Sequence, residues 1–340
     1  MRGFVVESPG RYGLAELPEP APGPGELLVA PAAVGVCGSD LELLDGRRPS
    51  EYVRYPVIPG HEWAGHVVAC GPGVDGIEPG MPLVAEGVRA CGRCPRCAEG
   101  RNNVCSAEYA ETGFTLPGAL ADRLVVPARL AHPLSTQRPI ATAALIEPAA
   151  CVATGLLEVG IPRAGSRVAV VGDGPLGLLA IVLLRLTSPR ELLLVGSRPQ
   201  RIGYATRLGA TATVRRDEVA GLNEFDVVVE CTNSPAGAAV ALGLARRAGT
   251  VVLLGISGAG TPAVDPDVIT LGNLRVQGIF AATRAAWRWL VELYGAGLFD
   301  PSPLITHRFE LGQVDEAFAV LGDRDAGALK VVVEPNGGEG

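Results

Sequence analysis

Short apolar runs separated by proline- and glycine-rich turns fill the first part of the chain. The runs at residues 27–30, 67–69 and 124–126 have the length of strands, and residues 22–25 form one of the turns. Runs this short, bounded by residues that favour turns, are typical of β-strands rather than of helices. The chain up to residue 149 is therefore predicted to be rich in β-structure.

The pattern changes near residue 150, where apolar strands begin to alternate with helical stretches of alanine, leucine and arginine. The predicted strands lie at residues 167–171, 191–195, 212–214, 226–230, 250–254 and 275–278. This alternation predicts an α/β fold with a doubly wound parallel sheet. We expect residues 150–287 to form this dinucleotide-binding domain. Residues 1–149 and 288–340 should form the β-rich domain, which the apolar run at 329–333 would rejoin as a strand.

The composition narrows the classes of protein to which this chain can belong. Its 340 residues are 48% hydrophobic and 19% charged, enough to bury the cores of two domains. The formal net charge of −7 argues against nucleic acid or an anionic membrane as a partner. The N-terminus lacks the apolar stretch of a signal peptide, and the longest apolar run, 176–186, is interrupted by Arg185. We therefore expect a cytoplasmic protein with no membrane partner.

A glycine motif joins the first strand of the second domain to an apolar helix predicted at 178–186. The motif reads Gly172-Asp-Gly174-Pro175-Leu176-Gly177, which is G-x-G-x-x-G between a strand and a helix. Gly172 would allow the tight turn, Gly174 the approach of a pyrophosphate, and Gly177 close packing of helix on strand. The helix N-terminus adds unpaired N–H groups. These residues are predicted to bind a dinucleotide; a glycine-rich turn without a ligand is the alternative.

The end of the second strand of this domain indicates which dinucleotide is bound. An acidic residue there would accept a hydrogen bond from the ribose 2′-hydroxyl of NAD, but this chain has Gly196. Without that carboxylate a 2′-phosphate is not repelled, and Ser197 with Arg198 can bind it. We therefore predict that NADP(H) is preferred over NAD(H). The alternative is that Arg198 is a solvated turn residue and that both cofactors are accepted.

Four cysteines lie within fifteen residues of the first domain. Their spacing is C-x2-C-x2-C-x7-C, and they are Cys91, Cys94, Cys97 and Cys105. Thiolates this close in sequence suit a tetrahedral zinc site, and four sulfur ligands leave no open position. We predict a structural zinc. Two disulfides are an alternative, although a chain without a secretory signal is expected to keep its thiols reduced; free cysteines are another.

A second set of metal-ligand residues is spread over three segments. They are Cys37 in Val-Cys-Gly-Ser-Asp40, His61 in Pro-Gly-His-Glu-Trp63, and Glu147 before Pro148. One thiolate, one imidazole and one or two carboxylates leave room for water or substrate, as at a catalytic zinc. Each residue alone is more typical of a core, but together with the cysteines and the glycine motif they predict a catalytic metal centre.

With these motifs in place, the whole chain resembles the zinc alcohol dehydrogenases, members of the medium-chain dehydrogenase/reductase superfamily. The polyol and threonine dehydrogenase branch, with Glu-Pro at the third ligand position, is the most similar. The resemblance implies a GroES-like catalytic domain, a Rossmann domain, and a homodimer or homotetramer. Residues 195–199 resemble NADP-dependent secondary alcohol dehydrogenases. Residues 55–63 resemble aminocyclitol dehydrogenases such as 2-deoxy-scyllo-inosamine dehydrogenase.

Carried onto this chain, the resemblance implies that Cys37, His61 and Glu147 hold the catalytic zinc. Glu62 would be a ligand that exchanges with water or a carboxylate just behind the ligands. Asp40 would orient His61 through its free ring nitrogen. Two zinc ions per chain, one catalytic and one structural, are therefore expected.

The reaction implied is reversible oxidation of a secondary alcohol to a ketone, with hydride transfer to NADP. Ser39 would pass the proton of the alcohol toward solvent. Members of the family often carry His three residues after this serine, where this chain has Glu42, so the relay beyond Ser39 stays open. We expect a polyol, cyclitol or aminocyclitol substrate. Glu86 or Glu42 would suit hydroxyl or amine groups, unless both face solvent.

Two other functions are compatible with the same residues. One is an NADPH-dependent reductase of ketones or aldehydes, which uses the same catalyst in the reverse direction. The other is a non-catalytic NADPH-binding sensor, which the presence of the metal-ligand residues disfavours.

Overall fold

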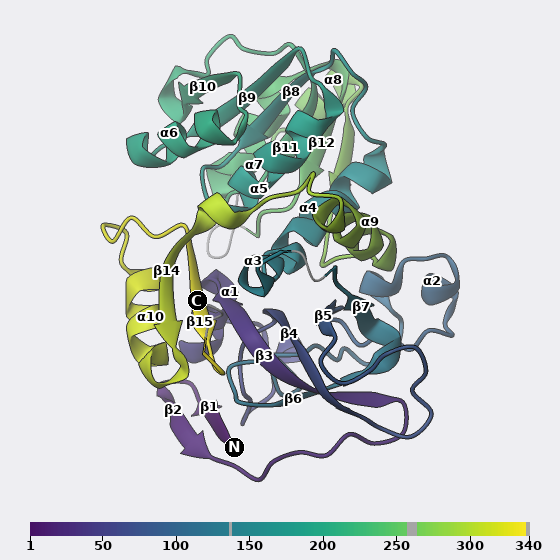
Figure 1. Cartoon of the computed structure of the whole chain (residues 1–340). Helices are drawn as coiled ribbons and strands as arrows, with labels where there is room; N and C mark the ends of the chain where they lie inside the picture. Colours follow the sequence, from purple (N-terminus) through teal and green to yellow (C-terminus); the bar gives the residue numbers. More distant parts are fainter. Residues whose placement is uncertain (136–137, 257–263, 338–340) are drawn as a thin grey trace. The chain divides into compact units, whose positions relative to one another are not determined.

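The chain divides into two units in the computed structural model, which describes residues 1–135, 138–256 and 264–337 (Figure 1). The first unit comprises Met1–Glu147 and Thr283–Gly340, and the second comprises Pro148–Ala282. The boundary expected between residues 287 and 288 falls inside helix α9, which spans Arg284–Gly295. The structure therefore assigns the whole of this helix to the first unit.

A seven-stranded sheet forms the centre of the first unit. Its strand order is β14-β15-β3-β4-β5-β7, with β6 paired to β3. The strands are β3 (Glu26–Val36), β4 (Glu62–Cys70), β5 (Pro82–Ala85), β6 (Leu124–Pro127), β7 (Ala131–Pro133), β14 (Ile305–Glu310) and β15 (Lys330–Glu334). The predicted return of the C-terminal strand is confirmed, because β15 pairs antiparallel with β3 (Figure 1).

Alternating apolar side chains build the core of this unit. Leu27, Val29, Val34 and Val36 of β3 are fully buried, together with Val331 and Val333 of β15. A separate hairpin, β1 (Arg2–Ser8) with β2 (Arg11–Glu16), adds Phe4 and Val6. The helices of this unit are α1 (Gly38–Leu44), α2 (Pro95–Ala98), α3 (Ile140–Ala143), α9 and α10 (Val314–Gly322). The short 3-10 helices are Ser50–Tyr52, Asn102–Val104, Ala128–Leu130, Ser302–Leu304 and Leu311–Gln313.

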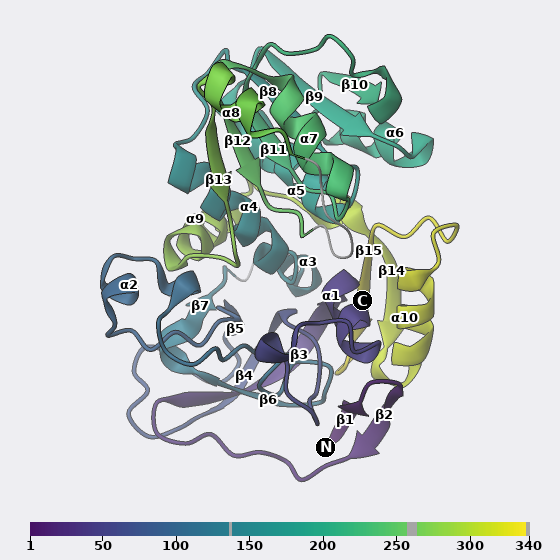
Figure 2. The ribbon, with the colours of Figure 1, turned by 180° about the vertical axis from the view of Figure 1, so that it is seen from behind.

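The second unit confirms the predicted doubly wound parallel sheet. Its order is β10-β9-β8-β11-β12-β13, so that β10 and β13 lie at opposite edges (Figure 2). The strands are β8 (Arg167–Val171), β9 (Glu191–Gly196), β10 (Ala212–Arg215), β11 (Phe225–Glu230), β12 (Ala245–Leu253) and β13 (Arg275–Gly278). The helices are α5 (Pro175–Leu184), α6 (Pro199–Leu208), α7 (Pro235–Leu244) and α8 (Pro266–Gly272), while α4 (Ile146–Val159) crosses the boundary between the units. Two 3-10 helices span Arg185–Thr187 and Arg216–Glu218.

Two elements of the second unit begin several residues earlier than predicted. Helix α5 begins at Pro175 rather than at residue 178, because proline is tolerated in the first turn of a helix. Strand β12 begins at Ala245 rather than at residue 250, and Ala248 within it has a positive φ of 58°. Within the described residues, no helix combines the length and the apolar character needed to cross a membrane.

Candidate metal centre and nucleotide loop

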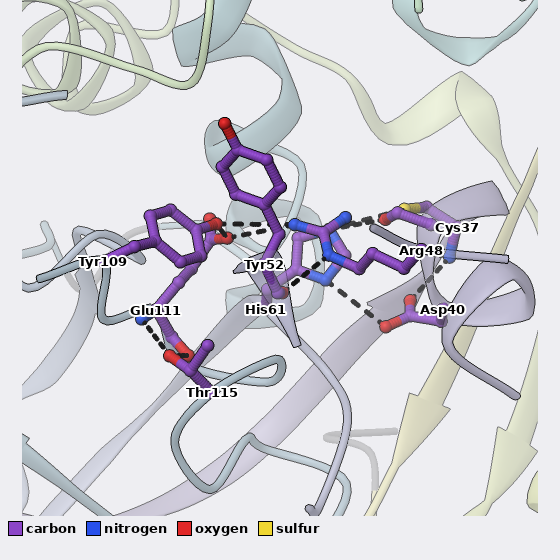
Figure 3. Close-up of polar contacts among 9 residues, drawn as sticks. Cys37, Asp40, Arg48, Tyr52, His61, Tyr109, Glu111 and Thr115 are labelled. Carbon is purple, nitrogen blue, oxygen red and sulfur yellow. Dashed lines mark hydrogen bonds and ion pairs between the residues drawn. The ribbon is translucent and has the colours of Figure 1, made fainter. Parts of the chain in front are cut away.

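Helix α1 and strand β4 bring the first two predicted metal ligands together. Cys37 is the residue before α1, and His61 is the residue before β4. Cys37 Sγ lies 3.3 Å from His61 Nε2 (Figure 3). Ser39 Oγ lies 2.7 Å from the same sulfur and 3.5 Å from the same nitrogen. A thiol, an imidazole and a hydroxyl therefore converge on one point.

Asp40 holds the other side of the His61 ring. Its carboxylate is fully buried, accepts a hydrogen bond from Cys37 N at 3.0 Å, and places Oδ1 3.4 Å from His61 Nδ1 (Figure 3). Burial raises the pKa of Asp40, but the charge and hydrogen bond of His61 outweigh burial and hold this pKa below its usual value. Nδ1 is thus directed at a carboxylate, which leaves Nε2 to face Cys37, the arrangement seen for imidazoles that bind metals.

Glu62 joins Cys37 and His61 but is also paired with a buried lysine. The three ligand atoms lie within 4.8 Å of one another. Glu62 Oε2 forms an ion pair with Lys330 Nζ, and both side chains are 3% exposed. Lys330 is the only lysine of the chain. Because the ammonium occupies one oxygen of Glu62, the geometry suits a carboxylate behind the ligands at least as well as a direct ligand.

Glu147 is not brought into this group. It lies in the first turn of α4, is half-buried, and is absent from the set of ligand atoms within 4.8 Å of one another among the described residues. Burial, reinforced by the charges of Glu62 and Glu111 and opposed by His61 and Lys330, raises its pKa to about 8. Glu147 therefore lies within electrostatic reach of the group, and its role as a ligand stays a prediction.

The charges around His61 favour a cation at this point. Burial lowers the pKa of His61, but the negative charges of Cys37 and Asp40 outweigh it and raise this pKa well above the usual value. Asp40 Oδ1 and His61 Nδ1 are buried and face each other, and Glu62 Oε2 is buried and faces Lys330. A pocket with an excess of anionic and imidazole donors fits a divalent cation, and the mixture of sulfur, nitrogen and oxygen fits zinc.

The four cysteines of the first unit also form a cluster. Their sulfur atoms lie within 4.8 Å of one another, and Cys94 Sγ is 3.9 Å from Cys105 Sγ. All four are free thiols, so the disulfide alternative finds no support in this geometry. Backbone N–H groups of Ser106 and Cys97 point at Cys94 Sγ and lower its pKa to about 6. Sulfur atoms this close and already supplied with N–H donors fit a four-thiolate zinc site.

The glycine motif has the geometry of a dinucleotide loop. Gly172 has a φ of 119°, which few other residues adopt, and a Cβ on Gly177 would lie 1.9 Å from Gly172 O. A Cβ on Gly174 would meet nothing within 4 Å in the part of the chain that the structure describes, so this part leaves the space beside Gly174 open. Pro175 and Leu176 form the first turn of α5 with Gly174 as its N-cap. These residues fit a pyrophosphate at the helix N-terminus.

Ser197 and Arg198 lie beside this loop, as the order of the strands in the sheet requires. Both donate their backbone N–H groups to Asp173, the second residue of the motif, at 2.8 and 2.7 Å. Arg198 Nη2 lies 2.9 Å from Asp173 Oδ1. Asp173 was not among the residues of the motif that were predicted to bind the dinucleotide.

A charged group near His61 was also missed. Phe114 lies 4.6 Å from the His61 ring, and the guanidinium of Arg48 lies 3.5 Å above the Phe114 ring. Arg48 Nη2 is 3.4 Å from both Glu111 Oε2 and the Tyr109 hydroxyl, which also donates to Glu111 (Figure 3). Arg48 and Glu111 lie 63 residues apart in polar segments, so no local spacing in the sequence indicated this group.

Glu86 does not have either of the roles expected for it. Its side chain is 1% exposed, so it does not face solvent, and three protein groups occupy its carboxylate. Arg284 Nε lies 2.6 Å away, Asn102 Nδ2 3.0 Å and His132 Nε2 3.2 Å. A carboxylate with these partners links the four-cysteine segment to the start of α9 rather than binding a substrate.

Two family models match the chain. Residues 23–136 match the alcohol dehydrogenase GroES-like domain, and residues 175–296 match the zinc-binding dehydrogenase domain. This chain belongs to the zinc-dependent medium-chain dehydrogenases. Within the family, the polyol and threonine dehydrogenase branch is supported by two relatives. An L-threonine 3-dehydrogenase of Solibacter usitatus is 29% identical, with 96% of this chain and 98% of the relative covered. A sorbitol dehydrogenase of Bacillus subtilis is 28% identical, with 99% and 98% covered.

Solved structures of dehydrogenases agree with this chain over nearly the full length. A zinc-binding dehydrogenase of Sinorhizobium meliloti, solved with NADP, has a TM-score of 0.90 at 32% identity, with 98% of this chain and 99% of that chain covered. An alcohol dehydrogenase of Escherichia coli, solved with NADH, has a TM-score of 0.90 at 26% identity and the same coverage. The fold class and the enzyme class predicted from the sequence are thus confirmed.

Proposed function

We propose that this dehydrogenase oxidises a secondary alcohol of the polyol, cyclitol or aminocyclitol class with NADP, and that it holds one catalytic and one structural zinc. The observation that carries the proposal is the convergence of Cys37, His61 and Ser39 on one point, with Asp40 behind the imidazole. Thiolate and imidazole are zinc ligands, and a hydroxyl beside them can accept a proton from a bound alcohol.

Each residue of the site would have a distinct role in the reaction. Cys37 and His61 would hold the catalytic zinc, with Glu62 or Glu147 as a further ligand. When bound, zinc would supply Lewis-acid stabilisation of negative charge on the oxygen of the substrate. Ser39 Oγ would take the proton of the alcohol, and Asp40 would keep Nδ1 of His61 engaged.

The cofactor preference is supported by the end of strand β9. Gly196 offers no carboxylate to the ribose, and Arg198 follows with 41% of its side chain exposed. An exposed guanidinium can bind a phosphate through two parallel hydrogen bonds. These features support NADP over NAD.

The substrate class is supported by the polar group around Arg48. Glu111 and the Tyr109 hydroxyl lie close to it, and Phe114 links this group to His61. Carboxylate, guanidinium and phenol groups can offer further hydrogen bonds to a substrate with several hydroxyls or an amine, whereas an aliphatic alcohol has no more than one hydroxyl to use them. A cyclitol amine such as 2-deoxy-scyllo-inosamine is one member of the class.

Initial rates with a panel of substrates test the proposal. The panel holds 2-deoxy-scyllo-inosamine, myo-inositol, sorbitol, L-threonine and 2-propanol, each with NADP and with NAD, and metal analysis of the same preparation gives the zinc content. We expect a strong rate on one cyclitol or polyol with NADP, and two zinc ions per chain. A Ser39→Ala variant should keep both zinc ions and lose most of the rate. A preference for 2-propanol would contradict the proposed substrate class, and a preference for NAD would contradict the proposed cofactor.

The same residues would catalyse reduction of a ketone or aldehyde by NADPH in the reverse direction. A non-catalytic sensor is disfavoured, because such a protein has no need for Ser39 between the thiol and the imidazole. A homodimer or homotetramer and a cytoplasmic location stay predictions.

A further inference from the structure

A carboxylate is present near the end of strand β9 although the strand itself lacks one. Asp173, from the middle of the glycine motif, is 3% exposed and lies against residues 197 and 198. Its Oδ2 accepts hydrogen bonds from Ser197 N at 2.8 Å and Arg198 N at 2.7 Å. Its Oδ1 accepts from Arg198 Nη2 at 2.9 Å and from Nε at 3.3 Å.

Gly196 and Asp173 are complementary in space. A Cβ added to Gly196 would lie 3.2 Å from both Cβ and Oδ2 of Asp173, and 3.0 Å from Ile202 Cγ1. The side chain of Asp173 therefore fills the space next to residue 196 that a larger residue there would need. Because residue 196 is glycine, the end of the strand has no acidic side chain of its own, and the acidic side chain of Asp173 fits beside it.

The carboxylate of Asp173 has no capacity left for a ribose hydroxyl. A carboxylate offers about four lone-pair sites, and the two backbone N–H groups and the two guanidinium N–H groups occupy that number. Burial raises the pKa of Asp173, but these hydrogen bonds and the charge of Arg198 outweigh burial and keep the carboxylate ionised. Asp173 is therefore an acceptor for the protein rather than for a ligand.

The guanidinium of Arg198 is held on one edge only. Nε and Nη2 face Asp173, while Nη1 has no partner among the described residues and 41% of the side chain is exposed. Arg201, one helical turn further along α6, lies close enough for its charge to act on Arg198.

We infer that Asp173 is a positioning residue for the recognition of the 2′-phosphate of NADP: it fixes Arg198 and the Ser197 backbone so that the outer edge of the guanidinium meets the phosphate. The inference rests on the proposed preference for NADP and adds a residue to it. A side chain held in place before binding loses less conformational entropy when the ligand arrives, so its contacts contribute more affinity.

Binding of two fragments of the cofactor, measured by calorimetry on the zinc-loaded protein, tests this inference. Adenosine 2′,5′-bisphosphate carries the 2′-phosphate, and 5′-AMP lacks it. We expect Asp173→Asn to weaken the bisphosphate about tenfold and to change 5′-AMP less than twofold, because asparagine keeps the shape and one acceptor but loses the ion pair. Arg198→Ala should weaken the bisphosphate at least as much, and adding Asp173→Asn to it should have little further effect.

Asp226→Asn is the matched control. Asp226 accepts from a backbone N–H, that of Arg167, at 2.7 Å and from Arg246 Nε at 2.6 Å, at the opposite end of the parallel strands. This variant loses a similar ion pair and should bind both fragments as the wild type does.

Three outcomes would overturn the inference. Tighter binding of the bisphosphate by Asp173→Asn would mean that Asp173 repels the phosphate. Equal weakening of both fragments would mean that the residue only supports the loop. No change in either would mean that Arg198 needs no support. The proposed NADP preference is tested separately, by the binding of the two fragments to the wild type alone. A wild type that binds the bisphosphate no more tightly than 5′-AMP would overturn both.

Discussion

Buried charges around the candidate metal centre occur in pairs of opposite sign. Asp40 faces His61, Glu62 faces Lys330, and their side chains are 8% exposed or less. Removing one partner of a buried pair leaves the other charge uncompensated, which costs more than the pair contributes. The individual residues behind the ligands are therefore expected to matter as much as the ligands.

The pairing of Asp40 with His61 predicts an effect on zinc affinity. Asp40→Asn should weaken the catalytic zinc about 10- to 100-fold, because the imidazole loses the carboxylate that fixes its ring and raises its basicity. Competition with a chromophoric chelator measures this, and the four-cysteine site in the same molecule should keep its affinity. Asp45→Asn, at an exposed residue paired with Arg47, is the control. Unchanged affinity in Asp40→Asn would show that His61 is held by other contacts.

Asp122 predicts a dependence of stability on pH. Burial raises the pKa of Asp122, but hydrogen bonds from Arg2 outweigh burial and lower it from about 3.8. Because the pKa is lower in the folded state, the contribution of Asp122 to stability is present above about pH 3.8. It is lost as the pH falls through the folded value. Thermal unfolding of wild type and Asp122→Asn should differ at pH 7 and 5, and the difference should shrink as the pH falls below about 3.8; a constant difference would contradict this linkage.

Some residues of the site could be predicted from the sequence and others could not. Cys37 and His61 stand in short motifs, so their chemistry was readable before their distance was known. Lys330 and Glu62 are paired across most of the length of the chain, and no local spacing reports such a contact. The one available signal was a single lysine inside an apolar strand, where an unpaired ammonium would be costly.

Among the elements, the loop between β8 and α5 shows that its glycines have different functions. A Cβ on Gly177 would meet Gly172 O at 1.9 Å, whereas a Cβ on Gly174 would meet no atom of the described residues within 4 Å. Gly177 is required by the packing of helix α5 on strand β8. Gly174 meets no such restriction among the described residues, and the open space beside it fits a ligand that approaches the backbone.

This difference predicts opposite phenotypes for two alanine variants. Gly177→Ala should destabilise the second unit, because α5 must move away from β8. Gly174→Ala should fold as the wild type does and lose affinity for NADP, because the methyl group would occupy the space above the loop. Thermal unfolding and calorimetry separate the two effects, with Gly203→Ala in α6, where a Cβ also meets nothing, as the control. Full NADP affinity in Gly174→Ala would mean that the cofactor does not approach this residue.

The four-cysteine segment is joined to helix α9 by Asn102. Asn102 accepts the backbone N–H of Arg284 at 2.8 Å and donates to Glu86, which in turn holds the Arg284 side chain. Cys97→Ser should therefore release one zinc ion and also speed hydrogen exchange at the start of α9. Cys70→Ser, at a thiol that contacts Ile77 O outside the cluster, should do neither. Loss of zinc without faster exchange in α9 would show that Asn102 is held by the backbone alone.

Boundaries of elements were less predictable than their order. The spacing of apolar runs predicted the strands of the parallel sheet, since each must be apolar to be buried on both faces. The first turn of α5 was missed because Pro175 and the glycines read as a loop. The eleven residues of β3 were read as four, because Pro31 falls within the strand, where its register with β4 shifts.

At the scale of the whole molecule, the chain leaves the first unit at Pro148 and returns to it at Thr283. The metal group and the four cysteines both lie in the first unit, and the nucleotide loop lies in the second. The change from short strands to alternating strands and helices made the passage from the first unit to the second predictable. The return of the chain to the first unit was predicted at residue 288 but occurs at Thr283. The composition of α9 resembles that of the helices before it, and only its contacts assign it to the first unit.

The burial of Lys330 also determines whether reagents that attack amines can modify the folded protein. Only Lys330 carries an ε-amino group, and the amino group of Met1 donates to Leu17 O at 2.8 Å. Acylating probes, amine cross-linkers and enzymes that attach groups to lysine therefore find no exposed side-chain target in the native chain. Incorporation of such a probe at Lys330 would record the detachment of strand β15, so that this one lysine can report on unfolding of the first unit.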